Sequence, residues 1–238
     1  MPFVNLSPVL SDALVARGYE ALTPVQTQVS EDQAKGRDLL VSAQTGSGKT
    51  VAFGLAMGDE LLEDGRMPYA TSPLALIVAP TRELAAQVAE NFEKYGKNHD
   101  LKLALLIGGV QMGDQVKALN EGVDVLIATP GRLMDLFERG KILLNGCELL
   151  VIDEADRMLD MGFIPDIETI CSKLPEPRQT LLFSATMPPP IEKLAKKFLN
   201  NPKRIEVSRA ATTNKDITAF KVPVKSRQNR ETLRWLLN

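Results

Sequence analysis

The sequence has 238 residues, of which 44% are hydrophobic and 24% are charged, the composition of a soluble globular protein with ample material for a core. No apolar run approaches the roughly 20 residues that span a bilayer, and the N-terminus lacks the basic and apolar pattern of a secretory signal. We therefore exclude a membrane protein and expect a cytoplasmic one. Cys147 and Cys171 match no metal-ligand spacing and are interpreted as free thiols.

The net charge of −2 conceals an asymmetry along the chain. Residues 203–238 hold nine Lys and Arg against three acids, so this segment carries +6 and residues 1–202 carry −8. A basic tail of this kind is usually solvated surface, and direct contact with a nucleic acid is the alternative.

Six apolar runs alternate with longer helical patterns. The runs are almost continuously apolar, which is typical of parallel strands covered on both faces. The predicted strands are residues 38–43, 74–79, 103–108, 124–129, 149–153 and 180–185. Residues 84–92 and 191–198 repeat apolar side chains at helical spacing. This alternation predicts a doubly wound α/β fold, with a mostly parallel sheet, helices on both faces and ligands beyond the carboxyl ends of the strands.

The stretch AQTGSGKT (43–50) directly follows the first predicted strand and precedes a helical pattern. Its glycines would let the backbone curl so that N–H groups point at phosphate oxygens, while Lys49 reaches the β- and γ-phosphates and the Thr50 hydroxyl ligates Mg²⁺. Ala43 stands where the common pattern has its first glycine, so a structural Gly/Ser-rich loop is the alternative. The predicted nucleotide-binding residues of this loop are Gln44, Thr45, Gly46, Ser47, Gly48, Lys49 and Thr50.

Three carboxylates follow the predicted strand 149–153 within four positions. Asp153, at the tip of an apolar strand, is predicted to hold Mg²⁺ directly or through water, and Glu154 to polarise a water for in-line attack on the γ-phosphate. Helix capping is the alternative for these acids, and for Asp156 we leave it open. Asp160 is assigned to a solvent face or to a local pair with Arg157.

The sequence after Val207 departs from the strand–helix alternation. Residues 208–216 are polar and indicate a linker, residues 221–225 could begin a strand, and residues 229–238 could form a short helix with leucines on one face. One strand and one helix cannot form a core, so we interpret 208–238 as a linker and the first fragment of another domain. An exposed patch at residues 235–237 could pack back on the body or support self-association.

Together these segments strongly resemble the DEAD-box ATP-dependent RNA helicase family, specifically its N-terminal RecA-like domain, over residues 3–207. Seven short motifs occur in the family's order. They are GYEALTPVQ (18–26), AQTGSGKT (43–50), PTREL (80–84), GG (108–109), TPGR (129–132), DEAD (153–156) and SAT (184–186). The resemblance implies a RecA-like P-loop NTPase that uses ATP and Mg²⁺, and the family's form of the phosphate loop carries alanine at position 43.

The resemblance also assigns residues on the adenine side of the site. In the family's Q motif a glutamine amide reads the adenine edge, which is the role implied for Gln26, with Tyr19 and Thr23 in the same motif. Leu22 stands where the family has proline. Phe3 is the candidate for the aromatic that stacks on adenine, although it stands about two residues closer than usual, and an ordinary hydrophobic anchor is the alternative.

The remaining motifs resemble those that hold the RNA backbone and those that couple hydrolysis to strand separation. The implied RNA-binding residues are Pro80, Thr81, Arg82, Gly108, Gly109, Thr129, Pro130, Gly131 and Arg132, and the implied coupling residues are Asp156, Ser184 and Thr186. Segments 80–82 and 129–132 each lie at a strand end before a helix, so their N–H groups could hold phosphates, cap the helix, or do both. Because the body is acidic, we predict weak and steeply salt-dependent RNA affinity.

The family's mechanism requires a second RecA-like domain that closes over ATP and supplies arginines, worth roughly 10³–10⁵ in rate in related phosphoryl-transfer systems. We therefore expect this chain to bind nucleotide but to hydrolyse and unwind little. Three functions remain open for the parent protein: an RNA-dependent ATPase and helicase, a nucleotide-gated RNA clamp or scaffold, and a DNA translocase of related fold.

Overall fold

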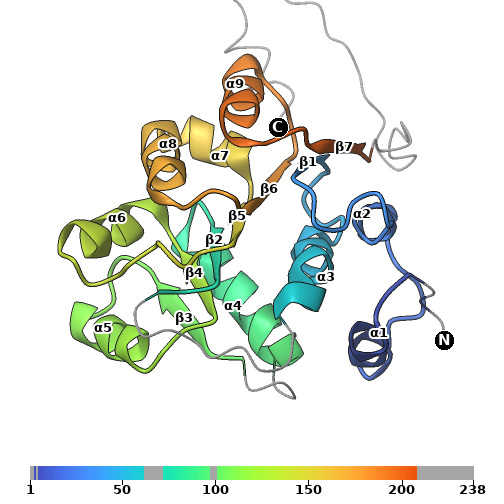
Figure 1. Ribbon diagram of the computed structural model, residues 1–238, viewed down its shortest axis with the longest axis horizontal. Helices are drawn as coiled ribbons and strands as arrows, with labels where there is room; N and C mark the ends of the chain where they lie inside the picture. The colour runs from blue at the N-terminus through green and yellow to red at the C-terminus, as the bar shows by residue number, and fades with distance from the viewer. Residues whose placement is uncertain (1–2, 4, 62–71, 97–100, 208–238) are drawn as a thin grey trace, which may run out of the picture. The chain divides into compact units, whose positions relative to one another are not determined.

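The structure is a computed structural model that describes residue 3 and residues 5–61, 72–96 and 101–207 (Figure 1). Met1–Ser208 forms one compact unit, to which the following description refers. The predicted linker, the strand and helix beyond it, and the patch at residues 235–237 lie outside the described residues, so those interpretations stay predictions.

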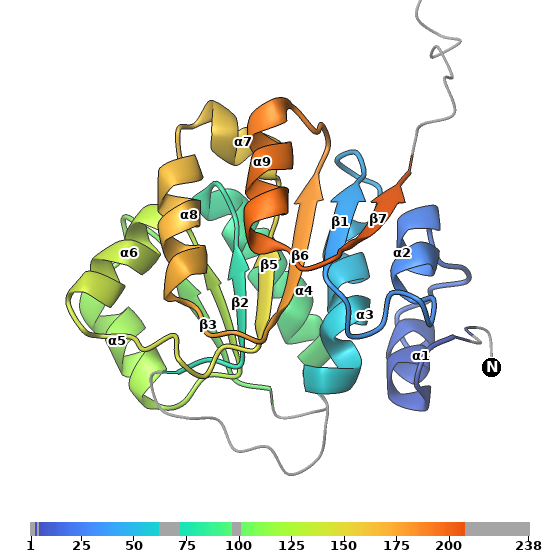
Figure 2. The same ribbon diagram turned by 45° about the horizontal axis from the view of Figure 1, so that its top comes forward.

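A seven-stranded sheet forms the centre of the unit, in the order β3-β4-β2-β5-β6-β1-β7. Every pair of neighbouring strands is parallel, and Figure 2 shows the arrows pointing the same way. The strands are β1 (Leu39–Ser42), β2 (Ala75–Val78), β3 (Leu103–Leu106), β4 (Val125–Ala128), β5 (Leu149–Ile152), β6 (Gln179–Ser184) and β7 (Lys203–Glu206). All six predicted strands are confirmed, each within two residues at either end.

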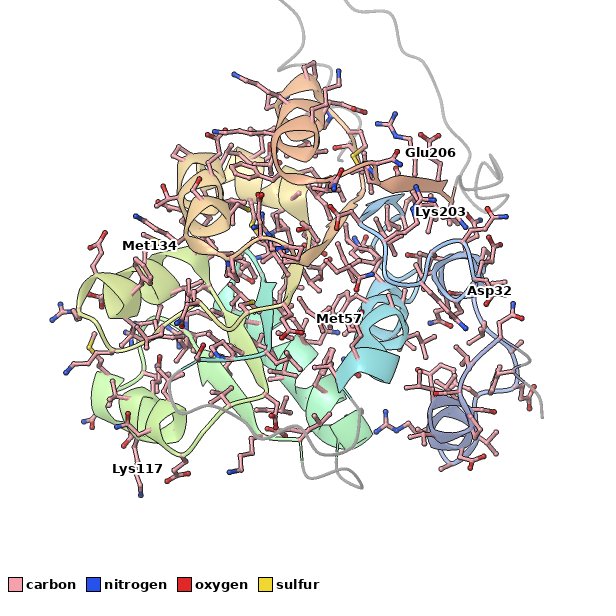
Figure 3. The ribbon with its side chains drawn as sticks, viewed as in Figure 1. Asp32, Met57, Lys117, Met134, Lys203 and Glu206 are labelled. Atoms are coloured by element: carbon pink, nitrogen blue, oxygen red, sulfur yellow. The ribbon has the colours of Figure 1, made fainter. Side chains whose placement is uncertain are left out.

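The seventh strand, β7, was not predicted, and its composition explains why. Lys203 and Glu206 lie at its two ends (Figure 3), and of its four residues only Ile205 is buried. The strand lies at the edge of the sheet and pairs with β1 alone, so one buried side chain and one row of ladder hydrogen bonds suffice to hold it. An edge strand of this kind carries no continuous apolar run.

Helices cover both faces of the sheet, as predicted for a doubly wound fold. One face carries α5 to α9 and the other carries α2, α3 and α4 (Figures 1 and 2). The helices are α1 (Pro8–Val15), α2 (Pro24–Val29), α3 (Lys49–Leu61), α4 (Arg82–Gly96), α5 (Met112–Asn120), α6 (Pro130–Glu138), α7 (Ala155–Asp160), α8 (Ile164–Lys173) and α9 (Pro189–Phe198). The helical repeats at 84–92 and 191–198 become α4 and α9.

The strand residues alternate between two apolar cores. In β2, Leu76 packs into the core with α5 to α9, whereas Ile77 packs into the core with α2 to α4, and neither has exposed surface. Met57 of α3 is also fully buried, on the side that faces the sheet (Figure 3). Each such side chain contributes about 1.5–3 kcal/mol of burial free energy, which holds the sheet edge and its loops in place.

Helix α1 packs on the outer side of α3 and not on the sheet. Leu14 of α1 and Leu55 of α3 share a small apolar cluster. The contact is close at Gly58, where an added Cβ would lie 2.7 Å from Leu10 Cδ2. An apolar cavity lined mainly by α1 and α3 lies at this junction, away from the phosphate loop.

Both cysteines are buried and free, as predicted. Burial raises the pKa of the Cys147 thiol, and likewise that of Cys171, to about 12, so both stay protonated and unreactive at neutral pH. Among the described residues, no helix combines the length and the apolar character needed to cross a membrane.

Candidate active site

The polar motifs converge on one edge of the sheet. Because all strands are parallel, each motif follows the carboxyl end of its strand, and these ends lie together. Segments 43–50, 153–156 and 184–186 follow β1, β5 and β6, which are neighbours, and segments 80–82, 108–109 and 129–132 follow β2, β3 and β4, which are neighbours as well. The strand order therefore separates the half of the edge that carries the predicted phosphate loop from a second, arginine-bearing half.

The phosphate loop runs from β1 into the first turn of α3. Gly46 and Gly48 have φ angles of +79° and +88°, which a side chain would strain, and they let the loop curl back on itself. Lys49 is only 6% exposed, and its Nζ atom is buried without a hydrogen-bond partner. A buried ammonium without a partner is costly unless an anion joins it, so this cradle fits a phosphate group.

The segment that carries the Q motif is bound directly to this loop. The Thr23 hydroxyl donates to Ser47 O at 2.9 Å, and Gln26 Nε2 donates to Gly48 O at 3.2 Å. Gln26 Oε1 accepts the Thr23 N–H at 2.9 Å, which closes the start of α2. No local sequence pattern indicates the two contacts with the loop, because they join residues 24 and 22 positions apart.

Two assignments on the adenine side, those of Gln26 and Phe3, stay predictions. Gln26 is 1% exposed, and both of its polar atoms already have protein partners, so a role in reading adenine would use its second N–H and second lone pair. Phe3 is 4% exposed and packs with Leu14, Val51 and Leu55. This burial favours the hydrophobic-anchor alternative for Phe3. Tyr19 lies half-buried against the same cluster.

The first two acids of the DEAD motif are buried beside the phosphate loop. Asp153 and Glu154 are 6% and 8% exposed, and Asp153 Oδ1 accepts the Glu154 N–H at 2.9 Å. Burial raises the pKa of Asp153 to about 6, and the positive charge of Lys49 opposes that rise. A divalent cation would relieve the same electrostatic penalty.

These residues fit Mg²⁺ held jointly with a nucleotide. In the described part of the chain, no three His, Cys, Asp or Glu side chains gather around a common point. A carboxylate from Asp153 and a hydroxyl from Thr50, with phosphate oxygens and water, would supply the kind of oxygen ligands that Mg²⁺ takes in phosphoryl-transfer sites. The site would therefore depend on substrate phosphates for part of its coordination.

Glu154 occupies a strained backbone position with φ +51° at the start of α7. Its carboxylate Oε2 lies 3.5 Å from Arg157 Nη1. Of the two alternatives given for Asp160, the solvent face is confirmed, because Asp160 is exposed and Arg157 pairs with Glu154, one helical turn earlier.

The third acid of the motif joins two segments far apart in the sequence. Asp156 Oδ2 accepts hydrogen bonds from both the backbone N–H and the hydroxyl of Thr186, each at 3.0 Å. The Asp156 N–H donates to Ser184 Oγ at 3.1 Å. Although partial burial raises the pKa of Asp156, the hydrogen bonds from Ser184 and Thr186 lower it overall. The structure thus places the three predicted coupling residues in contact.

On the arginine-bearing half of the edge, a threonine side chain caps one of the two helix starts, as the capping alternative for these motifs predicted. Thr81 Oγ1 accepts the Leu84 N–H at 3.3 Å and so caps α4. Thr129 precedes α6, whose first residue is Pro130, but its side chain makes no capping hydrogen bond. The Thr129 hydroxyl is therefore not engaged at its own helix and could serve a ligand.

The two predicted RNA-binding arginines meet the turn after β3. Arg132 Nη1 donates to Val110 O at 3.3 Å. Gly109 has φ +77°, and a Cβ added there would lie 2.3 Å from Arg82 Nη1. The structure thus brings segments 80–82, 108–109 and 129–132 together, with two guanidinium groups beside exposed backbone.

Comparison with known proteins links this geometry to one family. The DEAD/DEAH box helicase family model matches residues 23–194. The chain is 41% identical over 234 residues to the DEAD-box ATP-dependent RNA helicase CshA of Bacillus subtilis, covering 98% of this chain and 46% of that protein. It is 43% identical over 205 residues to the mitochondrial DEAD-box ATP-dependent RNA helicase 9 of Arabidopsis thaliana, covering 86% and 33%. The chain thus spans about half or less of the length of these relatives.

Solved structures give the same result. A DEAD box protein from Methanococcus jannaschii superposes with a TM-score of 0.76 at 36% identity, over 98% of this chain and 61% of that one. The yeast DEAD-box splicing factor Prp28 superposes with a TM-score of 0.79 at 33% identity, over 86% and 50%. The RecA-like fold expected from the sequence is therefore confirmed.

Proposed function

Because this chain belongs to the DEAD/DEAH box helicase family, we propose that it is the N-terminal, ATP-binding RecA-like domain of an ATP-dependent RNA helicase. Residues 1–207 would form this domain, and residues 208–238 would form a linker and the start of a second RecA-like domain. The parent protein would couple ATP binding and hydrolysis to the local separation of short RNA duplexes.

One observation carries the proposal: the buried Lys49 ammonium has no hydrogen-bond partner among the described residues and lies at the start of α3, inside a glycine loop. The N–H groups at this helix start add partial positive charge in the same place. Asp153 is buried close enough for the Lys49 charge to affect its pKa. A nucleotide carrying phosphates and Mg²⁺ supplies the anion that Lys49 lacks and the cation that Asp153 lacks.

The hydrolysis step follows from the placement of the two buried acids. Asp153 and Thr50 would hold Mg²⁺, which would neutralise charge on the phosphates. Glu154 would accept a proton from the water that attacks the γ-phosphate, and Lys49 would stabilise the charge that develops on the phosphate oxygens. The contacts of Asp156 with Thr186 and Ser184 would transmit a change at the acids to β6.

RNA would bind along the other half of the sheet edge, through its backbone. Arg82, Arg132 and the N–H groups at the starts of α4 and α6 would contact phosphates without reading bases. Because hydrolysis also requires arginines from the second RecA-like domain, this chain alone should bind nucleotide and show little ATPase activity or unwinding.

The test is a titration of labelled ATP and ADP into this chain and into the full-length parent protein, each with and without single-stranded RNA. We expect both to bind nucleotide, and only the full-length protein to show RNA-stimulated ATPase activity.

Lys49→Ala should abolish nucleotide binding, whereas Glu154→Gln should retain binding and lose hydrolysis. RNA-stimulated duplex unwinding by this chain alone would overturn the assignment, and stronger stimulation by single-stranded DNA than by RNA would indicate a DNA translocase.

A further inference from the structure

Residues 107–110, here called the glycine turn, leave β3 at the arginine-bearing half of the edge. Arg132 donates to Val110 O at the end of this turn, at 3.3 Å. Arg82 lies so close to Gly109 that a Cβ there would approach its Cζ to 2.9 Å. Both guanidinium groups therefore lie against the backbone of one turn, Arg132 through a hydrogen bond and Arg82 by close approach.

Gln115, in the second turn of α5, holds the first residue of the glycine turn. Its Nε2 donates to Ile107 O at 3.0 Å. The side chain is 5% exposed and lies beneath the turn, so it has little surface with which to touch a ligand itself.

The amide of Gln115 is only half satisfied. Its Oε1 atom is buried and has no hydrogen-bond partner. A buried acceptor without a partner destabilises the folded protein, and an apolar side chain of similar length would fill this space without that penalty. The favourable contribution of an amide at this position is therefore its bond to Ile107 O.

We propose that Gln115 is a positioning residue for RNA binding, which fixes the glycine turn and, through it, the guanidinium groups of Arg82 and Arg132. This inference rests on the proposed function, because it concerns how that surface is held ready for a phosphate backbone. Three helices contribute to this surface. Helices α4 and α6 supply the two arginines, and α5 supplies Gln115, which holds the glycine turn that both arginines contact.

The test compares Gln115→Met with the wild-type chain. Methionine keeps the length and packing of the side chain but cannot donate to Ile107 O. We expect RNA affinity to fall roughly 3- to 10-fold, with a shallower dependence of log K on log salt, because fewer phosphates are contacted at once. Nucleotide affinity should change less than about twofold, because the phosphate loop lies on the other half of the sheet.

The measurement is fluorescence anisotropy of a labelled single-stranded RNA over a salt series, with nucleotide titration and thermal unfolding of the same samples. Gln87→Met, on the exposed surface of α4, is the matched control and should bind RNA like the wild type. In a double-mutant cycle with Arg132→Gln, the two losses should combine to less than their sum, since both act through the glycine turn. A purely structural role would lower the melting temperature without changing the salt slope.

Gln115→Asn provides a second variant in case methionine disrupts folding. Its amide is one methylene too short to reach Ile107 O, so the same loss of RNA affinity is expected. Wild-type RNA affinity and salt slope in a folded Gln115 variant would overturn this inference and leave the proposed function intact. Failure of the wild-type chain to bind RNA at any salt concentration would overturn both.

Discussion

Single residues at this site are held in positions that are unfavourable for folding and useful for binding. Lys49 buries a charge without a partner, Asp153 buries a carboxylate, and Glu154 adopts a left-handed backbone conformation. Each feature is unfavourable in the folded protein, and the two buried charges would be offset by a phosphate and a cation. Removing one of these buried charges should therefore stabilise the nucleotide-free protein.

Asp153→Asn is predicted to stabilise the nucleotide-free protein at neutral pH. The pKa of Asp153 is about 6 in the folded state and near the ordinary value of 3.8 in the unfolded state. The folded protein therefore binds this proton more tightly than the unfolded chain does. Stability of the wild type is thus lost as pH rises from about 4 through 6, by on the order of 3 kcal/mol, and asparagine removes that loss. Urea unfolding at pH 4 and pH 7 should show a gain for the variant only at pH 7. An equal effect at both pH values would contradict the electrostatic origin.

Gly48→Ala is predicted to disrupt the contact between Gln26 and the phosphate loop. A Cβ at this position would lie 2.4 Å from Gln26 Nε2, on a backbone with φ +88°. We expect a loss of about 1–2 kcal/mol of stability from the left-handed conformation, together with a clear fall in nucleotide affinity. Gly113→Ala, in α5 with no atom within 4 Å, is the control and should stabilise by roughly 0.5–1 kcal/mol. Denaturant unfolding and nucleotide titration measure both effects, and unchanged nucleotide affinity in Gly48→Ala would refute this argument.

From the sequence, individual site residues could be proposed, but the contacts that hold them could not. Gly46, Lys49 and Asp153 were identifiable because strand, loop and helix follow one another directly in the chain. The bond from Gln26 to Gly48 O was not identifiable, because it depends on how α2 packs against α3. For Asp160 the sequence left a solvent face and a pair with Arg157 open, since helical spacing lets Arg157 reach either Asp160 or Glu154, and only the turn at Glu154 decides between them.

At the scale of elements, apolar periodicity identified every strand that is covered on both faces. It missed β7, whose single buried residue, Ile205, leaves no periodic signal. The same strand is bound to the turn that follows α2 by an ion pair at 2.7 Å between Lys203 and Glu31, which no local pattern indicates. Elements that are placed by long-range contacts thus lie beyond what composition and spacing can predict.

The close packing of α1 on α3 leads to a prediction about Gly58. Gly58→Val should displace α1, because its Cβ would meet Leu10 Cδ2 at 2.7 Å and Cδ1 at 2.9 Å. We expect a loss of roughly 1–3 kcal/mol from overpacking, measured by urea unfolding, and faster proteolysis within α1. Gly54→Ala, whose Cβ would lie an ordinary 3.7 Å from Phe92, should be tolerated. Wild-type stability in Gly58→Val would show that α1 contributes little to the fold.

The whole unit groups its motifs by strand order rather than by sequence order. Along the chain, the three motifs of the arginine-bearing half, within residues 80–132, come between the phosphate loop and the two later motifs of its half, and the order β3-β4-β2-β5-β6-β1-β7 sorts them. Strand–helix alternation predicted a parallel sheet, but it did not determine the order of the strands. The separation of the half that carries the phosphate loop from the arginine-bearing half therefore became visible only in three dimensions.

Nucleotide should stabilise the whole unit by mass action. At 100 times its dissociation constant, a ligand specific for the folded state adds about 2.7 kcal/mol, which for a domain of this size raises the melting temperature by roughly 5–10 °C. Thermal unfolding over a series of ADP concentrations with Mg²⁺ should show this rise in the wild type and not in Lys49→Ala. A similar rise in Lys49→Ala would place the binding site away from the phosphate loop.

The position of β1 also governs when the protein can fold during its own synthesis. Leu39 pairs with Leu181 on one side and with Lys203 on the other, so both neighbours of β1 are translated long after it. Until residues 203–206 have emerged from the ribosome, β1 has an open edge that other chains could join. The loop that directly follows β1 is therefore among the first parts to be synthesised and among the last to be assembled.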